Sequence, residues 1–186
     1  MNNDISLKEK LKKLELLRNS KVCFGICSNT SDGKHIIMFD YDDISLNDVK
    51  NDIIAIQKKF NLSAFYVLSS DNGYNAFCLS KKSISEIKEI YNFSKHLDPL
   101  YIKLSFEKRG YFVLRMSGNK KLILTIVTNI NKDIISFAHY KFFKDIMRFN
   151  LLEFNHDIYI PYHDNLTTFR IIGYKSVKHG FLECEV

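Results

Sequence analysis

Hydrophobic and polar residues alternate along the chain with two different periods, and these periods predict its elements. Leucines recur at helical spacing among lysines over about residues 6–18, which predicts an amphipathic helix. Two further helices are predicted after Ser45 and Ser83, because each serine is a good N-cap and precedes apolar residues three or four positions apart. Residues 137–149, rich in Phe and Tyr, predict another helix.

The remaining apolar runs are short and bounded by turn residues, so they predict strands. The expected strands are Val22–Ile26, Ile36–Tyr41, Ala64–Leu68, Tyr74–Leu79, Leu100–Phe106, Tyr111–Met116 and Lys121–Thr128, with more between about Asp157 and Tyr174. Glu107–Gly110 is expected to be a hairpin turn. This mixture predicts an α+β fold, a mixed or antiparallel sheet flanked by helices. No linker rich in Pro, Gly or Ser interrupts it, so we expect residues 1–186 to form a single domain.

Composition narrows the class of protein. The net charge of +6 and the pI near 9.0 suit a polyanionic partner, although many basic domains bind none. No apolar run approaches the length of a membrane helix and the first residues are polar, so we expect a cytoplasmic protein with no membrane partner. The four cysteines lack a C-x-x-C pair, which favours reduced, buried thiols. A zinc site at Cys23 and Cys27 would need histidines from elsewhere in the chain.

The most informative stretch is an apolar strand that ends in carboxylates at alternating positions. Side chains of a strand alternate between its faces, so Asp40 and Asp42 point the same way and Tyr41 points to the other face. Two carboxylates this close repel each other unless a cation lies between them, and Mg²⁺ or Mn²⁺ accepts such oxygen ligands. The alternative is a strand end that simply meets solvent.

Two later stretches offer groups that suit phosphate. Ser70, Gly73 and Asn75 lie in a turn between strands, where hydroxyl and amide groups can contact phosphate oxygens. An ordinary Asn-Gly hairpin explains the same residues. Arg115 and Lys120 follow on a basic strand, and both side chains suit phosphate binding, although a solvated hairpin with basic ends is the alternative.

Taken in order, these stretches resemble the archaeo-eukaryotic primase superfamily, in the primase-polymerase form of plasmids and viruses. Its hhhDhD motif is similar to IMFDYD at Ile37–Asp42, and its S-x-x-G-Y-H motif to SDNGYN at Ser70–Asn75, where Asn75 stands in place of the histidine. A hydrophobic residue followed by Asp matches Leu97–Asp98, and a basic strand motif matches Arg109–Lys120 loosely. The resemblance covers about residues 36–121.

The resemblance implies a primase-polymerase-like catalytic core that binds Mg²⁺ or Mn²⁺, nucleoside triphosphates and a DNA or RNA template, with other replication proteins as further partners. It implies catalytic, metal-binding roles for Asp40, Asp42 and Asp98, and nucleotide-binding roles for Ser70, Gly73, Asn75, Arg115 and Lys120. The function expected is nucleotidyl transfer in the replication of a plasmid, virus or similar element. Because asparagine carries no positive charge, a catalytically inactive, nucleic-acid-binding replication-accessory protein is the alternative. A third possibility is an unrelated α+β protein whose acids are coincidental.

Overall fold

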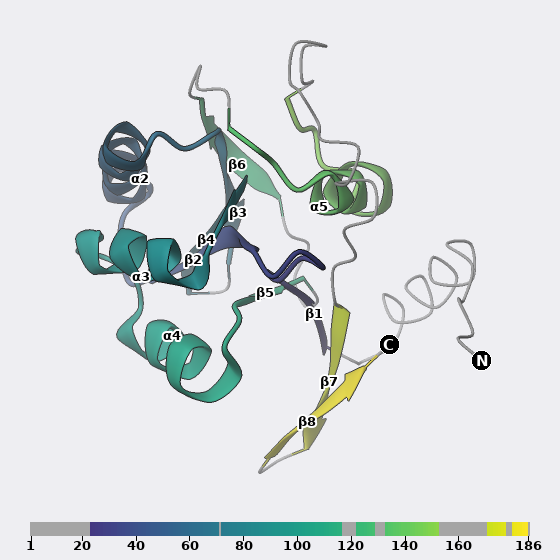
Figure 1. Ribbon diagram of the computed structural model, residues 1–186. Helices are drawn as coiled ribbons and strands as arrows, with labels where there is room; N and C mark the ends of the chain where they lie inside the picture. The colour runs from purple at the N-terminus through teal and green to yellow at the C-terminus, as the bar shows by residue number, and fades with distance from the viewer. Residues whose placement is uncertain are drawn as a thin grey trace.

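A computed structural model describes residues 23–70, 72–116, 122–128, 133–152, 171–177 and 180–185. The described chain is an α+β protein with four α-helices and antiparallel sheets, which confirms the predicted fold class at that level (Figure 1). Its elements are β1 (Cys23–Cys27), β2 (His35–Asp42), α2 (Leu46–Phe60), β3 (Phe65–Ser69), β4 (Gly73–Lys82), α3 (Ile84–Phe93), α4 (Pro99–Lys103), β5 (Val113–Arg115), β6 (Ile123–Val127), α5 (Phe137–Lys141), β7 (Ile171–Val177) and β8 (Gly180–Glu185). The π-helical turns η1 (Leu104–Arg109) and η2 (Phe142–Ile146) extend α4 and α5.

The sheet that contains Asp40 and Asp42 has the strand order β2-β4-β3-β6, and every pairing in it is antiparallel. β2 and β3 therefore run in the same direction, joined by α2, and β4 lies between them as in a split βαβ unit. This order places the end of β2 beside the start of β4, with Asp42 opposite Gly73. A second antiparallel sheet has the order β5-β1-β7-β8.

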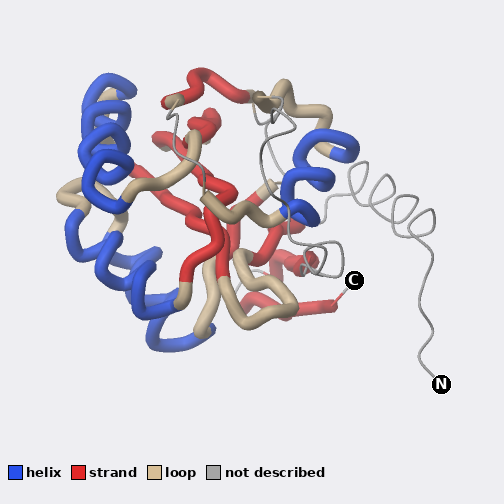
Figure 2. The backbone as a smooth tube through the Cα atoms, turned by 45° about the horizontal axis from the view of Figure 1, so that its top comes forward, coloured by secondary structure: helices blue, strands red, loops and turns tan. Residues whose placement is uncertain are grey.

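Local capping signals explain where the two longer helices begin. The Ser45 side chain accepts a hydrogen bond from the Asp48 backbone N–H at 3.2 Å at the start of α2. Ser83, the predicted N-cap, forms a reciprocal capping box with Glu86 at the start of α3. Helices α2, α3 and α4 lie along one side of the strands and α5 lies on the other (Figures 1 and 2).

Because helices cover both faces of the sheet, its central strands are apolar on both sides. On the α3 side, Phe39 of β2 packs against Phe65 and Tyr91, with ring centroids 5.2 and 5.4 Å apart. On the α5 side, Phe77 of β4 stacks on Phe143 at 4.1 Å. The polar residues at the end of β2 therefore follow a fully buried run.

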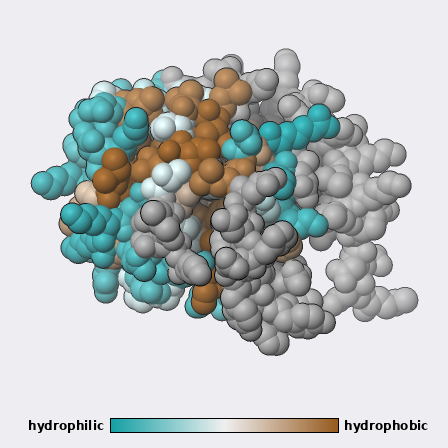
Figure 3. All heavy atoms as spheres, turned by 90° about the horizontal axis from the view of Figure 1, so that it is seen from above, coloured by the Kyte–Doolittle hydropathy of each residue, from teal (hydrophilic) through white to brown (hydrophobic). Residues whose placement is uncertain are grey.

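The side chains at the outer strand β6 are less completely buried than those of the central strands. The exposed large hydrophobic side chains of the described residues include Leu122 and Leu124 at this strand and Ile54 of α2. A band of hydrophobic atoms is visible on the face of the molecule seen from above (Figure 3). Among the described residues, no helix is long and apolar enough to cross a membrane.

The predicted hairpin over residues 100–116 is wrong in its first half, because residues 99–109 are helical. Asp98 caps the helix, Pro99 occupies its first turn, and Gly110 ends it with a positive φ of 71°. These helix-capping residues outweigh the alternation of apolar residues that predicted a strand. Leu100, which was expected in a sheet, is 62% exposed. The second strand of that hairpin forms, as β5.

Other predicted elements form with shifted ends. The helix expected over residues 137–149 is confirmed as α5 and η2, and the strand expected over Lys121–Thr128 as β6. The helix predicted over about residues 6–18 lies outside the described residues, as do residues 157–170 of the last predicted strands.

Candidate metal and nucleotide site

The end of β2 presents two carboxylates on one face of the sheet. Asp40 is half-buried and Asp42 is exposed, whereas Tyr41 between them is fully buried on the opposite face. The Tyr41 hydroxyl donates a hydrogen bond to Asp52 Oδ2 at 3.0 Å. The alternation expected from the sequence is therefore confirmed, and the Tyr41 hydrogen bond attaches β2 to α2 on the face opposite the acids.

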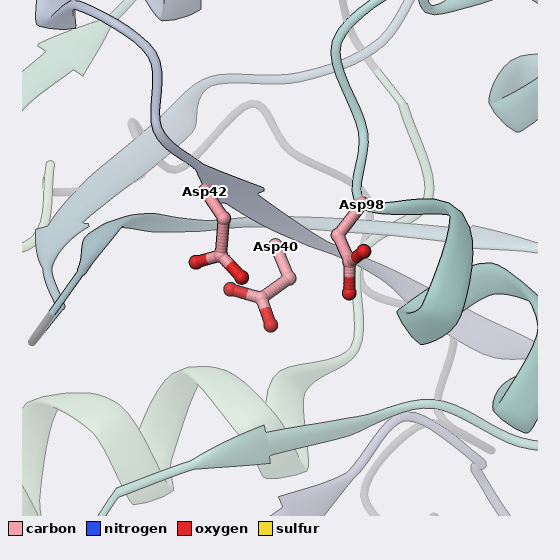
Figure 4. A group of neighbouring side chains, drawn as sticks. All are labelled: Asp40, Asp42 and Asp98. Carbon is pink, nitrogen blue, oxygen red and sulfur yellow. The ribbon is translucent and has the colours of Figure 1, made fainter.

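Asp98 brings a third carboxylate to the same place from a distant part of the sequence (Figure 4). One oxygen atom from each of Asp40, Asp42 and Asp98 lies within 4.8 Å of the others. Asp98 is the N-cap of α4, where its side chain accepts hydrogen bonds from the backbone N–H groups of Leu100 and Tyr101 at 3.0 and 2.9 Å. Its own backbone N–H donates to the Asp40 carbonyl oxygen at 3.0 Å, which ties the start of α4 to β2.

The three carboxylates repel one another. Burial, followed by the negative charges of Asp98 and Asp43, raises the pKa of Asp42. Within the described part of the chain, no Lys or Arg forms an ion pair with Asp42 or Asp98. A divalent cation would relieve this repulsion, and carboxylate oxygens are the ligands that Mg²⁺ and Mn²⁺ prefer. Exposed acidic groups are common without an ion, so metal binding enters below as a proposal.

Asn75, expected to contact nucleotide, lies directly beside the first acid. It pairs with Asp40 in the β2–β4 register, and its Nδ2 donates a hydrogen bond to Asp40 Oδ1 at 2.6 Å. The Asn75 residue is 6% exposed, so little of it is open to a ligand. The structure thus brings Asn75 to the acids, but with its amide directed at one of them.

Gly73 and Ser70 shape the hairpin at the same end of the sheet. A Cβ atom on Gly73 would lie 2.0 Å from the Tyr41 carbonyl oxygen, so no larger residue fits without movement of the backbone. The Ser70 N–H donates to the Gly73 carbonyl oxygen at 3.1 Å and helps to close the turn. Ser70 is therefore close in the fold to Asp42, which pairs with Gly73.

Of the two predicted basic residues, the structure describes Arg115. Arg115 is exposed and ends β5, where it pairs with Gly25 in the other sheet. Among the described residues, no hydrogen bond or ion pair joins Arg115 to the acids. Lys120 lies outside the described residues. Nucleotide binding by both residues stays a prediction.

A hydrogen-bonded group on the opposite face of β2 from the acids was not predicted from the sequence. Asp52 of α2 accepts hydrogen bonds from the Tyr41 hydroxyl and, at 2.6 Å, from the hydroxyl of Ser94, the C-cap of α3. Burial, together with the charge of Asp52 and its hydrogen bond, raises the pKa of the Tyr41 hydroxyl well above its usual value, which keeps this group a donor. The three partners come from three elements, so no local spacing reveals them.

The expected buried thiols are confirmed for Cys27 and Cys78, which are fully buried and form no disulfide among the described residues. Two buried histidines make polar contacts inside the protein: His35 Nδ1 lies 3.0 Å from the Ser28 hydroxyl oxygen, and His139 Nε2 lies 2.9 Å from the Cys27 carbonyl oxygen. Among the described residues, Asp40, Asp42 and Asp98 form a group of side chains that could hold a metal ion. The side chain of Cys23 lies outside the described part of the chain, so the zinc alternative stays a hypothesis.

No protein-family model, curated protein or solved structure matches this chain. The resemblance to primase-polymerases therefore stays a prediction from the sequence motifs.

Proposed function

We propose that this protein is a metal-dependent nucleotidyltransferase of the primase-polymerase type, which joins nucleotides on a DNA or RNA template. The observation that carries the proposal is the convergence of Asp40, Asp42 and Asp98, with oxygen atoms within 4.8 Å of one another. About 60 residues of sequence separate Asp40 from Asp98, yet a backbone hydrogen bond holds the two together. Such a group of acids at the end of a buried strand suits Mg²⁺ or Mn²⁺ with open positions for substrate phosphates.

In this proposal, bound Mg²⁺ or Mn²⁺ supplies activation of the attacking hydroxyl group and neutralises phosphate charge. The residues of the chain would hold the three carboxylates in position around the metal. Asp40 is oriented by Asn75 and by its place in β2, and Asp98 is fixed by the first turn of α4. Asp42 is the exposed member and faces the solvent from which a triphosphate would enter. The hairpin at Ser70 borders the same end of the sheet and offers a hydroxyl group to phosphate oxygens.

The alternative function, a nucleic-acid-binding accessory protein without catalysis, is favoured by one observation. Asn75 occupies the position where the resemblance places histidine, and its amide is engaged by Asp40. A residue that is neutral and engaged offers no cation to the phosphates. In this function, nucleic-acid binding would depend on the positive charge of the protein and not on the acids.

A primer-extension assay in Mn²⁺ tests the proposed function with a matched pair of variants. Asp42→Asn removes one charge from the acid group. Asp43→Asn removes one charge from the next residue, which is exposed, lies outside the group and has a positive φ of 54° that asparagine also adopts. We expect wild type and Asp43→Asn to extend a primer, and Asp42→Asn to lose at least about 100-fold in rate.

Equal product from wild type and Asp42→Asn would contradict the catalytic assignment and indicate a contaminating polymerase. No product from any of the three proteins, with DNA binding intact by fluorescence anisotropy, would favour the accessory function. Failure of wild type both to extend and to bind would refute both functions.

A further inference from the structure

We propose that Asn75 is a positioning residue that orients the Asp40 carboxylate, and not a ligand for the nucleotide. This inference depends on the proposed function, because it concerns one of its metal-binding acids. The Asn75 amide lies 2.6 Å from Asp40 Oδ1, and the two residues are cross-strand partners in β4 and β2. A residue 6% exposed with its amide turned to a neighbour has little surface for a substrate phosphate.

This hydrogen bond and one from Asp98 hold different parts of Asp40. Its carbonyl oxygen accepts from the Asp98 N–H at 3.0 Å, and its side chain accepts from Asn75. The first bond fixes the backbone and the second fixes the rotation of the carboxylate, so Oδ2 has a defined direction. Partners that hold a metal-binding carboxylate in this way typically contribute 10–100-fold to metal affinity.

The other two acids do not depend on Asn75. Asp98 is held by backbone N–H groups of α4, and Asp42 is exposed, with no side-chain hydrogen bond in the described part of the chain. Loss of the Asn75 amide should therefore weaken the acid group through Asp40 alone. A phosphate ligand would behave differently, since its loss would affect the triphosphate and leave metal affinity unchanged.

The test compares Asn75→Leu with Asn75→His. Leucine is similar in size and shape to asparagine and has no donor. Histidine can replace the donor, because its Nδ1 lies as many bonds from Cβ as Nδ2 does in asparagine. Two affinities are to be measured for each variant. The first is the Kd for Mn²⁺, from electron paramagnetic resonance of the free ion. The second is the Kd for a non-hydrolysable deoxynucleoside triphosphate at saturating Mn²⁺. Circular dichroism verifies folding, and Asn75→Ala, which adds no bulk, replaces Asn75→Leu if that variant does not fold.

We expect Asn75→Leu to raise the Kd for Mn²⁺ by about 10-fold or more, Asn75→His to restore it to within about 3-fold of wild type, and the triphosphate Kd to stay unchanged. An unchanged Mn²⁺ Kd in Asn75→Leu, with a weaker triphosphate, would overturn the positioning role and leave the proposed function standing. If wild type itself binds no Mn²⁺, or if Asp42→Asn binds it equally well, the metal site is refuted and this inference with it.

Discussion

The repulsion among the three carboxylates predicts that Asp42→Asn stabilises the protein when no divalent cation is present. The substitution keeps the shape of an exposed side chain and removes one of three negative charges that lie within 4.8 Å of one another. The gain in stability should reverse when metal is added, since the same charge is then needed to hold the cation.

The magnitude follows from the separation of the charges. Two unit charges 4.8 Å apart repel by about 0.9 kcal/mol in water and by about 3.5 kcal/mol at an effective dielectric constant of about 20. Because Asp42 is exposed, the value near the water limit applies, and we expect a gain of about 1 kcal/mol. For a domain of this size, that corresponds to an increase in Tm of about 2–4 °C.

Thermal unfolding in EDTA and in Mn²⁺ measures both effects. In EDTA, Asp42→Asn should unfold about 2–4 °C above wild type. At Mn²⁺ concentrations about 100 times the Kd, wild type should gain about 2.7 kcal/mol, or about 5–10 °C, and Asp42→Asn should gain much less. Asp43→Asn removes one negative charge, as Asp42→Asn does, but from outside the acid group. It therefore controls for the change in net charge and should keep the Mn²⁺ response, although it also relieves part of the repulsion on Asp42.

A lower Tm for Asp42→Asn in EDTA, together with a Mn²⁺ response equal to that of wild type, would refute the reasoning. The acids would then be neither a repulsive group nor a cation site.

Three further predictions test the support of the site and the charge of the surface. In urea unfolding, Gly73→Ala should lower the free energy of unfolding by more than about 2 kcal/mol, because its Cβ would overlap a β2 carbonyl oxygen. Gly110→Ala should lower it by only about 1 kcal/mol, because the new Cβ meets open space and only the positive φ is unfavourable. Burial alone would raise the pKa of Asp32, but its hydrogen bonds and the charge of Lys81 lower it below the usual 3.8. This ion pair therefore stabilises the protein above pH 3.8 and its contribution is lost as the pH falls through the lower, folded value, so Asp32→Asn should cost about 1 kcal/mol at pH 7 and the difference from wild type should disappear in acid. Arg115→Ala should reduce by about 1 the slope of log affinity for DNA against log salt concentration if Arg115 contacts phosphate, and an unchanged slope would exclude that contact.

The elements that the sequence predicted well are those whose signals are local. The N-caps Ser45 and Ser83 each satisfy backbone groups within their own first turn, so the starts of α2 and α3 could be predicted to the residue. The alternation at the end of β2 is likewise a property of one strand. Asp40 and Asp42 were therefore placed correctly on one face, with Tyr41 on the other.

Predictions that needed competition between signals or contacts between elements fared worse. The apolar alternation after Asp98 favoured a strand, but a capping carboxylate followed by Pro99 favoured a helix, and the helix forms. The resemblance gave Arg115 a nucleotide-binding role, and the pairing of its strand with β1 in the other sheet could not be predicted from the motif; the role itself stays a prediction. Pairing between distant strands is set by tertiary packing, which no short window of sequence contains.

The hydrogen bond from the Asp98 N–H to the Asp40 carbonyl oxygen makes a single backbone proton a reporter of the whole acid group. An amide proton exchanges with solvent deuterium when its hydrogen bond opens, and this one opens whenever α4 leaves the end of β2. The deuterium uptake of Asp98 therefore measures how often Asp98 separates from Asp40 and Asp42 in the ligand-free protein. A variant that loosens α4 would show faster uptake at this amide while the amides within β2 and β4 stay protected.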